Sequence, residues 1–125
     1  MTSKQMRDNP LFMRNSFESS GKWGIPIVKK QTIPTDDIML VACSDTRAND
    51  NAVNKNKGVH FFVDDYQFER LWNDPYRYLE KVKEFDCFLT PDFSLYLDMP
   101  MAMKIWNVYR SRLIGQMCQT AGIAV

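Results

Sequence analysis

Apolar residues occur along the chain in short runs separated by polar segments, and each run predicts one element of structure. The run Asp37 to Cys43 is almost continuously apolar, which is typical of a strand covered on both faces. Val59 to Val63 and Cys87 to Thr90 predict two more strands. Ile25 to Val28 is short and contains Pro26, so it suits an edge strand or an ordered loop.

Between these strands, apolar residues spaced by three and four predict a helix in two pieces. Asp64 or Asp65 is expected to cap the first piece. Asp74 as N-cap and Pro75 at the first helical position restart it as a second piece. The apolar face of the first piece is Phe68, Leu71 and Trp72, and that of the second is Tyr78, Leu79, Val82 and Phe85.

The longest helix is expected near the end of the chain, where Asp98 and Pro100 begin it and Gly122 ends it. Its methionine-rich start, Met99 to Met103, indicates either an adaptable apolar surface or core filling. Ile123 to Val125 then resembles the opening of a fourth strand. The expected buried stripe of the helix is Ala102, Ile105, Trp106, Tyr109, Leu113, Met117 and Ala121, with Lys104, Arg110, Arg112 and Gln116 on its other faces.

This order of elements predicts an α/β fold with a mostly parallel sheet, because repeated strand–helix units imply right-handed crossovers between parallel strands. We expect an N-terminal arm over residues 1–24 and a single α/β domain over residues 25–125. The last strand is short for a finished element. The domain is therefore expected to be truncated at its C-terminus and to be half of a larger barrel-like or open-sheet domain.

Composition narrows the possible functions. The chain has 125 residues and a formal net charge of +1, so no strong overall field attracts nucleic acid or an anionic membrane. Three widely spaced cysteines predict free buried thiols and not a disulfide framework. No secretory signal pattern or membrane-spanning run is present, which predicts a cytoplasmic protein without a membrane partner.

Acidic residues follow three of the predicted strands and form the first candidate site. Asp45, Asp64, Asp65 and Asp92 would lie at the same end of a parallel sheet, where α/β proteins bind ligands. Grouped carboxylates can bind Mg²⁺ or Mn²⁺, and Asp45 and Asp92 are the candidate catalytic pair. The alternative is structural, because Asp64 or Asp65 can cap a helix and the other two can close turns.

A weaker candidate is a nucleic-acid surface formed by basic residues. Lys55 and Lys57 lie in or beside a polar loop, and Arg110 and Arg112 lie near Trp106 on the last helix. The alternative is that the aromatic residues are core and the arginines are solvated. The sequence contains neither the P-loop nor the dinucleotide-binding glycine motif.

Two long motifs resemble one known family. They are V-H-F-F-V-D-D-Y-Q-F-E-R-L-W at residues 59–72 and P-D-F-S-L-Y-L-D-M-P at residues 91–100. Both are similar to the family called domain of unknown function 4417, as are the blocks at residues 9–12, 24–26 and 105–110. The resemblance implies a protein of phages, plasmids or integrative elements of Gram-positive bacteria whose members continue past Val125. It supplies no catalytic residue.

Three functional hypotheses follow from these observations. The first is a mobile-element accessory protein that binds a host protein or nucleic acid. The second is a metal-assisted enzyme that acts on a nucleotide or phosphodiester through the strand-end aspartates. The third is an inactive, truncated remnant that dimerises through its unfinished sheet edge.

Overall fold

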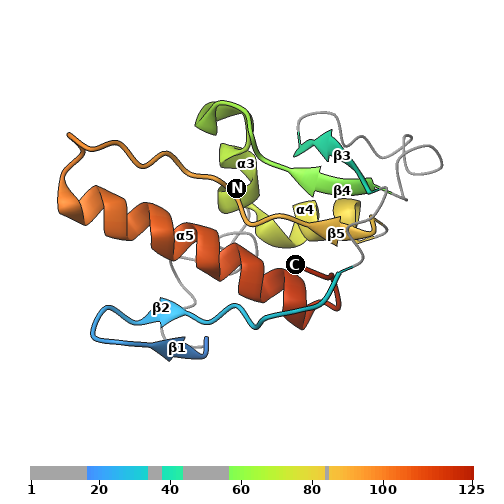
Figure 1. Cartoon of the computed structure of the whole chain (residues 1–125), viewed down its shortest axis with the longest axis horizontal. Helices are drawn as coiled ribbons and strands as arrows, with labels where there is room; N and C mark the ends of the chain where they lie inside the picture. Colours follow the sequence, from blue (N-terminus) through green and yellow to red (C-terminus); the bar gives the residue numbers. More distant parts are fainter. Residues whose placement is uncertain (1–16, 34–37, 44–56, 84) are drawn as a thin grey trace.

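The computed structural model describes residues 17–33, 38–43, 57–83 and 85–125, and in them the predicted parallel sheet is present (Figure 1). Strands β3 (Met39–Ala42), β4 (Lys57–His60) and β5 (Cys87–Phe88) pair in that order. Both pairings are parallel, with Val59 opposite Val41 and Phe88. The fold is α/β as predicted, and within the described residues the sheet is open and does not close into a barrel.

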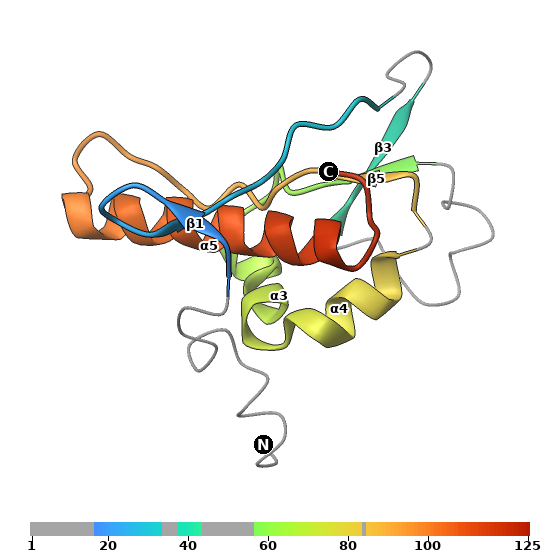
Figure 2. The ribbon, with the colours of Figure 1, turned by 90° about the horizontal axis from the view of Figure 1, so that it is seen from below.

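The helical connection between β4 and β5 has the predicted pieces. A short 3₁₀ turn, η3 (Asp65–Gln67), leads into α3 (Glu69–Asn73), and α4 (Pro75–Val82) follows directly. Asp74 is the N-cap residue of α4 and Pro75 its first residue, although the Asp74 side chain makes no capping hydrogen bond. Figure 2 shows the sheet and helices as separate layers, with α4 on one side of the sheet.

Helix α5 (Met101–Thr120) runs along the molecule between two strand layers. On one side lies a small antiparallel hairpin formed by β1 (Ser19–Ser20) and β2 (Ile25–Pro26). Gln116 of α5 is hydrogen-bonded to the backbone of this hairpin. Its Nε2 donates to the carbonyls of Glu18 and Ile27 at 2.7 and 3.0 Å. Residues 17–24, assigned from sequence to an arm, thus contribute a strand to the structure.

Aromatic residues from the sheet and the connecting helices meet in the core. Phe61 packs edge-on against Phe68 and Phe88, at ring-centroid distances of 5.3 and 5.0 Å. Phe68 in turn packs edge-on against Phe93 at 5.0 Å. All three cysteines are buried and none forms a disulfide, as predicted. No helix in the described part of the chain is long and apolar enough to cross a membrane.

Two sequence predictions about burial are wrong. Strand β3 is not covered on both faces, since Met39 and Leu40 are 64% and 43% exposed. Among the described strands, β3 lies at the edge of the three-stranded sheet and pairs with β4. The stripe predicted along α5 holds only in its C-terminal half. Leu113 and Met117 are buried there, whereas Ala102 and Trp106 near the helix start are exposed.

The last residues of the chain lie beside β5, as the predicted fourth strand would. The N–H of Phe88 donates to the carbonyl of Ala124 at 2.9 Å, and Ile123 is buried in the core. The N–H of Val125 donates to Oε1 of Gln31 at 2.7 Å. Gly122, at φ +83°, makes the turn from α5 into this segment, a backbone conformation that favours glycine.

Candidate functional site

Three of the four predicted aspartates lie around one hollow beyond the carboxyl ends of the parallel strands. Asp64 and Asp65 follow β4, and Asp92 follows β5. They line a hollow of about 580 Å³. Residues far apart in sequence thus meet beyond the carboxyl ends of the parallel strands, where ligand sites of such sheets lie. Asp45 lies outside the described residues. The remaining lining residues are Phe62, Val63, Gln67, Ser94, Leu95 and Tyr96.

The carboxylate of Asp65 makes hydrogen bonds within the fold. Its two carboxylate oxygens accept hydrogen bonds from the backbone N–H and the hydroxyl of Ser94, each at 3.0 Å. Asp64 occupies the N-cap position of η3 but makes no capping hydrogen bond with its side chain. Asp64 thus stands at the predicted N-cap position without the capping hydrogen bond, while Asp65, the first residue of η3, holds the segment after β5.

The metal hypothesis gains no support from the arrangement of these acids. Within the residues that the structure describes, no three or more His, Cys, Asp or Glu side chains form a group able to hold a metal ion. Asp64 and Asp92 are exposed, and Asp65 is bonded to Ser94. The Mg²⁺ or Mn²⁺ site and the catalytic roles of Asp45 and Asp92 stay predictions.

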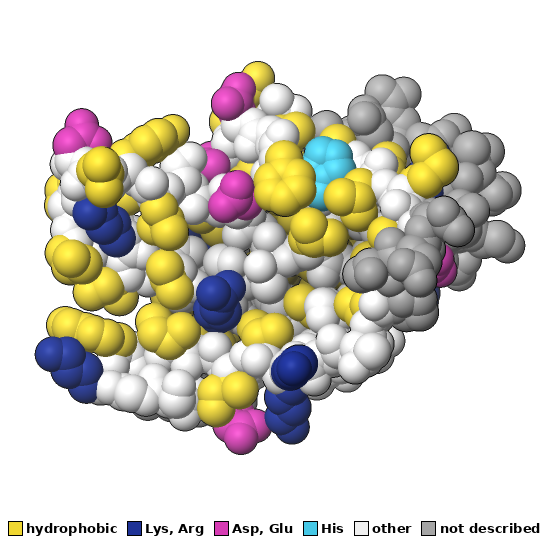
Figure 3. Space-filling model, in the orientation of Figure 1, with side chains coloured by type: hydrophobic (Ala, Val, Ile, Leu, Met, Phe, Trp, Pro, Cys, Tyr) yellow, Lys and Arg dark blue, Asp and Glu magenta, His cyan; other side chains and the backbone are white. Residues whose placement is uncertain are grey.

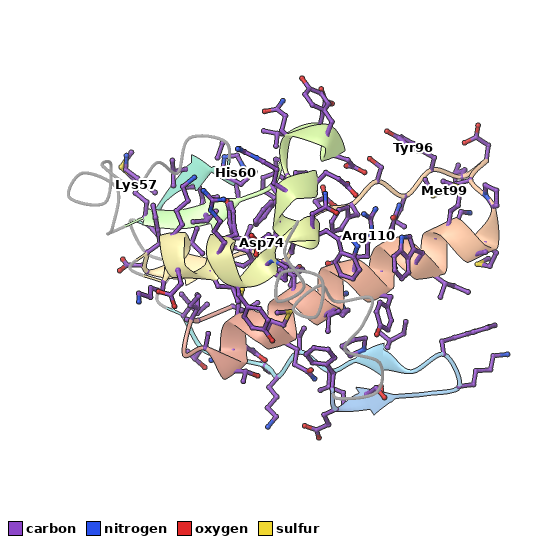
Figure 4. All side chains as sticks on the ribbon, turned by 180° about the vertical axis from the view of Figure 1, so that it is seen from behind. Lys57, His60, Asp74, Tyr96, Met99 and Arg110 are labelled. Atoms are coloured by element: carbon purple, nitrogen blue, oxygen red, sulfur yellow. The ribbon has the colours of Figure 1, made fainter. Side chains whose placement is uncertain are left out.

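Hydrogen bonds continue from Asp65 and Ser94 to Asn107, Arg110 and Glu69, a set that we call the polar ring because the backbone from Glu69 back to Asp65 completes it. The carbonyl of Ser94 accepts from Nδ2 of Asn107 at 2.7 Å, and Oδ1 of Asn107 accepts from Nη2 of Arg110 at 2.7 Å. Nη1 of Arg110 then donates to Oε1 of Glu69 at 2.9 Å. Because Glu69 lies four residues after Asp65, the ring joins η3, α3, α5 and the segment after β5. Figure 4 labels Arg110, the member that α5 contributes together with Asn107.

Arg110 is the most buried charged residue of the ring, with only 9% of its surface exposed. Its guanidinium carbon lies 3.8 Å from the ring centroid of Phe93, and 5.9 and 5.8 Å from those of Trp72 and Trp106. The prediction that Arg110 is solvated is therefore wrong. The helical spacing of Asn107, Arg110 and Ile114, all buried on one face, is the signal that sequence reasoning missed.

The nucleic-acid candidates do not form one surface in the described structure. Arg110 is buried and bonded to Glu69, so its guanidinium is not available to a phosphate. Arg112 is exposed beside Asp92, beyond the carboxyl end of β5. Lys57 is the first residue of β4, at the opposite end of the sheet. Lys55 lies outside the described residues.

The segment that the polar ring holds forms one wall of a second depression, which we call the apolar groove. It has a volume of about 370 Å³, within the range of ligand pockets. Lys104 is the one charged residue among those that line it. The lining residues are Trp23 and Ile25 of the hairpin, Leu95, Tyr96 and Leu97 of the segment, and Met101, Lys104, Ile105 and Val108 of α5.

Large apolar side chains around this groove are exposed to solvent. Leu97 is 99% exposed, Met101 65%, Tyr96 61% and Trp23 59%. Figure 3 shows hydrophobic side chains gathered over the N-terminal half of α5 and the segment before it, with Lys and Arg side chains among and beside them. The methionine-rich helix start thus forms an apolar surface, and the interpretation that these methionines fill the core is wrong for the exposed Met101 and Met103.

Backbone hydrogen bonds fix the wall that carries Leu97. Ser94 is bonded on both sides, through its N–H to Asp65 and through its carbonyl to Asn107. The carbonyl of Leu97 accepts from Nζ of Lys104 at 3.2 Å, and the N–H of Met99 donates to the carbonyl of Tyr96 at 3.2 Å. The exposed side chains are therefore presented from an anchored backbone, which reduces the entropy lost when a partner binds.

Comparison with known proteins identifies relatives over most of the chain. A family model described as Domain of unknown function (DUF4417) matches residues 17–125. The "Gene 1 protein" of Mycobacterium phage L5 is 44% identical over 117 residues, which are 92% of this chain and 49% of that protein. The "Gene 1 protein" of Mycobacterium phage D29 is 42% identical over 116 residues, 92% of this chain and 42% of that protein. The chain thus spans about half the length of these relatives or less. No solved structure matches it.

Proposed function

This chain belongs to the DUF4417 family, and we propose that it acts by binding a segment of a host protein in the apolar groove. The observation that carries the proposal is the exposure of Leu97, Tyr96 and Trp23 around a preformed depression. Contiguous apolar surface of this kind is the mark of protein interaction sites on folded domains.

The setting of the relatives supports a host protein as the partner. Both are proteins of mycobacteriophages, and phage proteins work among the proteins of the infected cell. A mobile-element accessory protein that binds a host protein or nucleic acid was the leading hypothesis from the sequence. The groove adds a location to the host-protein form of that hypothesis, and the polar ring anchors the wall that carries Leu97.

The groove has the properties that favour tight association. Its walls come from three parts of the chain, namely the hairpin, the segment around Leu97 and helix α5. Burying a Leu or Met side chain in a partner stabilises a complex by about 1.5–3 kcal/mol. The exposed methionine Met101 at the helix start can also adapt its shape to a partner.

The test compares two substitutions of exposed residues in the tagged chain. Leu97→Asp places a charge in the groove, whereas Tyr66→Asp changes a residue that is 77% exposed on η3 and does not line the groove. We expect a host protein from a mycobacterial lysate to be retained by the wild type and by Tyr66→Asp but lost by Leu97→Asp. Titration calorimetry with the purified partner should show the same order of affinities.

Equal retention by both variants would contradict the proposal, as would a purified partner whose affinity is unchanged by Leu97→Asp. Thermal melting of each variant controls for folding. Neither substitution should lower the melting temperature much, since surface changes away from specific contacts usually alter stability by less than about 0.5 kcal/mol.

A further inference from the structure

Two lysines place positive charge at the apolar groove, Lys104 among its lining residues and Lys22 beside Trp23. Lys104 lines the groove and is only half-exposed, and its Nζ donates one hydrogen bond to the carbonyl of Leu97. Lys22 is exposed beside the groove, with its Nζ 4.8 Å from the centroid of the Trp23 ring. An ammonium group has three donors, so Lys104 has donors left for a ligand.

Covering Lys104 with a purely apolar partner would be unfavourable. Removing an ammonium group from water carries a large desolvation cost unless an opposite charge or a hydrogen-bond acceptor replaces the water. The other lining side chains are apolar or aromatic and offer no carboxylate to Lys104. Asp98, which follows Leu97, is exposed and is not among the lining residues, so a carboxylate of the partner can replace the water around Lys104.

On the basis of the proposed function, we infer that the segment bound in the groove is an amphipathic acidic peptide. Its apolar side chains contact Trp23, Ile105 and Leu97, and its carboxylates pair with Lys104 and Lys22. The remaining donors of Lys104 supply a direct contact to one carboxylate. Lys22 lies at the side of Trp23, where a second carboxylate would meet an ammonium group already stacked on the ring.

Synthetic peptides test the inference without knowledge of the natural partner. Three labelled peptides share leucines at the i, i+3, i+4 and i+7 positions of a helix and carry Glu, Gln or Lys at the other positions. Fluorescence anisotropy measures their affinities for the 125-residue chain. We expect the Glu peptide to bind at least about tenfold more tightly than the Gln peptide, and more weakly as salt is raised.

Substitution of the lysines should reverse this preference. Lys104→Glu is expected to weaken the Glu peptide at least about tenfold and to improve binding of the Lys peptide, while Lys104→Arg keeps the charge and the affinity. Lys22→Glu should act in the same direction with a smaller effect, because Lys22 is more exposed. A melting curve for each variant shows whether the loss of the hydrogen bond to Leu97 has altered the fold.

The outcomes separate this inference from the proposed function. Equal binding of the Glu and Gln peptides, abolished by Leu97→Asp, would overturn the acidic preference and leave the groove as the binding site. Failure of all three peptides would also overturn it, whereas capture of a host protein that depends on Leu97 would still support the function. A homodimer that Leu97→Asp dissociates would overturn it as well, since a second copy would then fill the groove.

Discussion

Asp65 holds Ser94 through two hydrogen bonds, one from the backbone N–H and one from the hydroxyl, and both measure 3.0 Å. The two residues lie 29 positions apart, in η3 and in the segment after β5. Their contact joins the strand-end hollow to the polar ring. It also sets the position from which Leu95, Tyr96 and Leu97 project into the apolar groove.

Removing one or both of these hydrogen bonds should lower the free energy of unfolding, and removing both should lower it more. Ser94→Ala loses one hydrogen bond to a half-buried carboxylate and should lower the free energy of unfolding by about 1 kcal/mol. Asp65→Ala loses both hydrogen bonds and should lower it by about 2 kcal/mol. Urea unfolding measures both values. Asp92→Ala, at an exposed residue of the same hollow, is the control and should change stability by less than about 0.5 kcal/mol.

Replacing the buried Arg110 with lysine should destabilise the fold, even though the positive charge is kept. Arg110→Lys keeps the charge but cannot reach Glu69 and Asn107 together, because the planar fork of the guanidinium is lost. We expect a loss of about 2 kcal/mol in the free energy of unfolding. Arg112→Lys is the matched control on the exposed face of the same helix and should have almost no effect. Equal stability of the two variants would show that the polar ring does not stabilise the fold.

Gly115 should resist replacement by alanine, although alanine is the better helix former. A Cβ at this position would lie 2.8 Å from Cγ2 of Thr90 and 2.9 Å from Cγ2 of Val28. Both neighbours are β-branched, so they cannot easily turn away. Overpacking typically costs about 1–3 kcal/mol, against a gain in helix propensity of about 1 kcal/mol. Thermal melting should therefore show a net loss of stability, and a more stable Gly115→Ala would contradict the close packing of α5 between the two layers.

Stability should fall in mildly alkaline solution because of the buried thiols. Burial raises the pKa of Cys118 far above its usual value of 9.0. Burial, and to a lesser extent Asp86, also raises the pKa of Cys87. Above about pH 9 the unfolded chain loses these protons while the folded chain keeps them, so unfolding becomes more favourable as the pH rises. The free energy of unfolding of the wild type should decline from about pH 8 to pH 10 more steeply than that of Cys118→Ala. Equal slopes would contradict this effect.

Local sequence patterns predicted the elements whose signals lie within a few residues. The strands β4 and β5 and the Asp74–Pro75 start of α4 could be identified without knowledge of the rest of the chain. The bounds of β4 were wrong, because the strand is Lys57–His60 and not Val59 to Val63. The parallel order of the strands also predicted that Asp64 and Asp92 would lie around one hollow, as the structure shows.

Features that depend on distant contacts were missed. Arg110 appeared solvated because its partner Glu69 lies 41 residues away, and no local pattern reports that pairing. Strand β1 carries no apolar signal, and its pairing depends on a turn in which Gly21 and Gly24 adopt positive φ angles of 73° and 63°. The apolar groove could not be predicted either, because its walls come from three separate parts of the chain.

The most direct test of the proposed function is photo-crosslinking from inside the groove. A benzophenone amino acid replaces Leu97 in one protein and Tyr66 in another, and both are irradiated in mycobacterial lysate. Our account predicts a discrete adduct from position 97 that excess wild-type chain suppresses and excess Leu95→Asp chain does not. Equal adducts from both positions, or equal suppression by both competitors, would contradict the groove as the binding site.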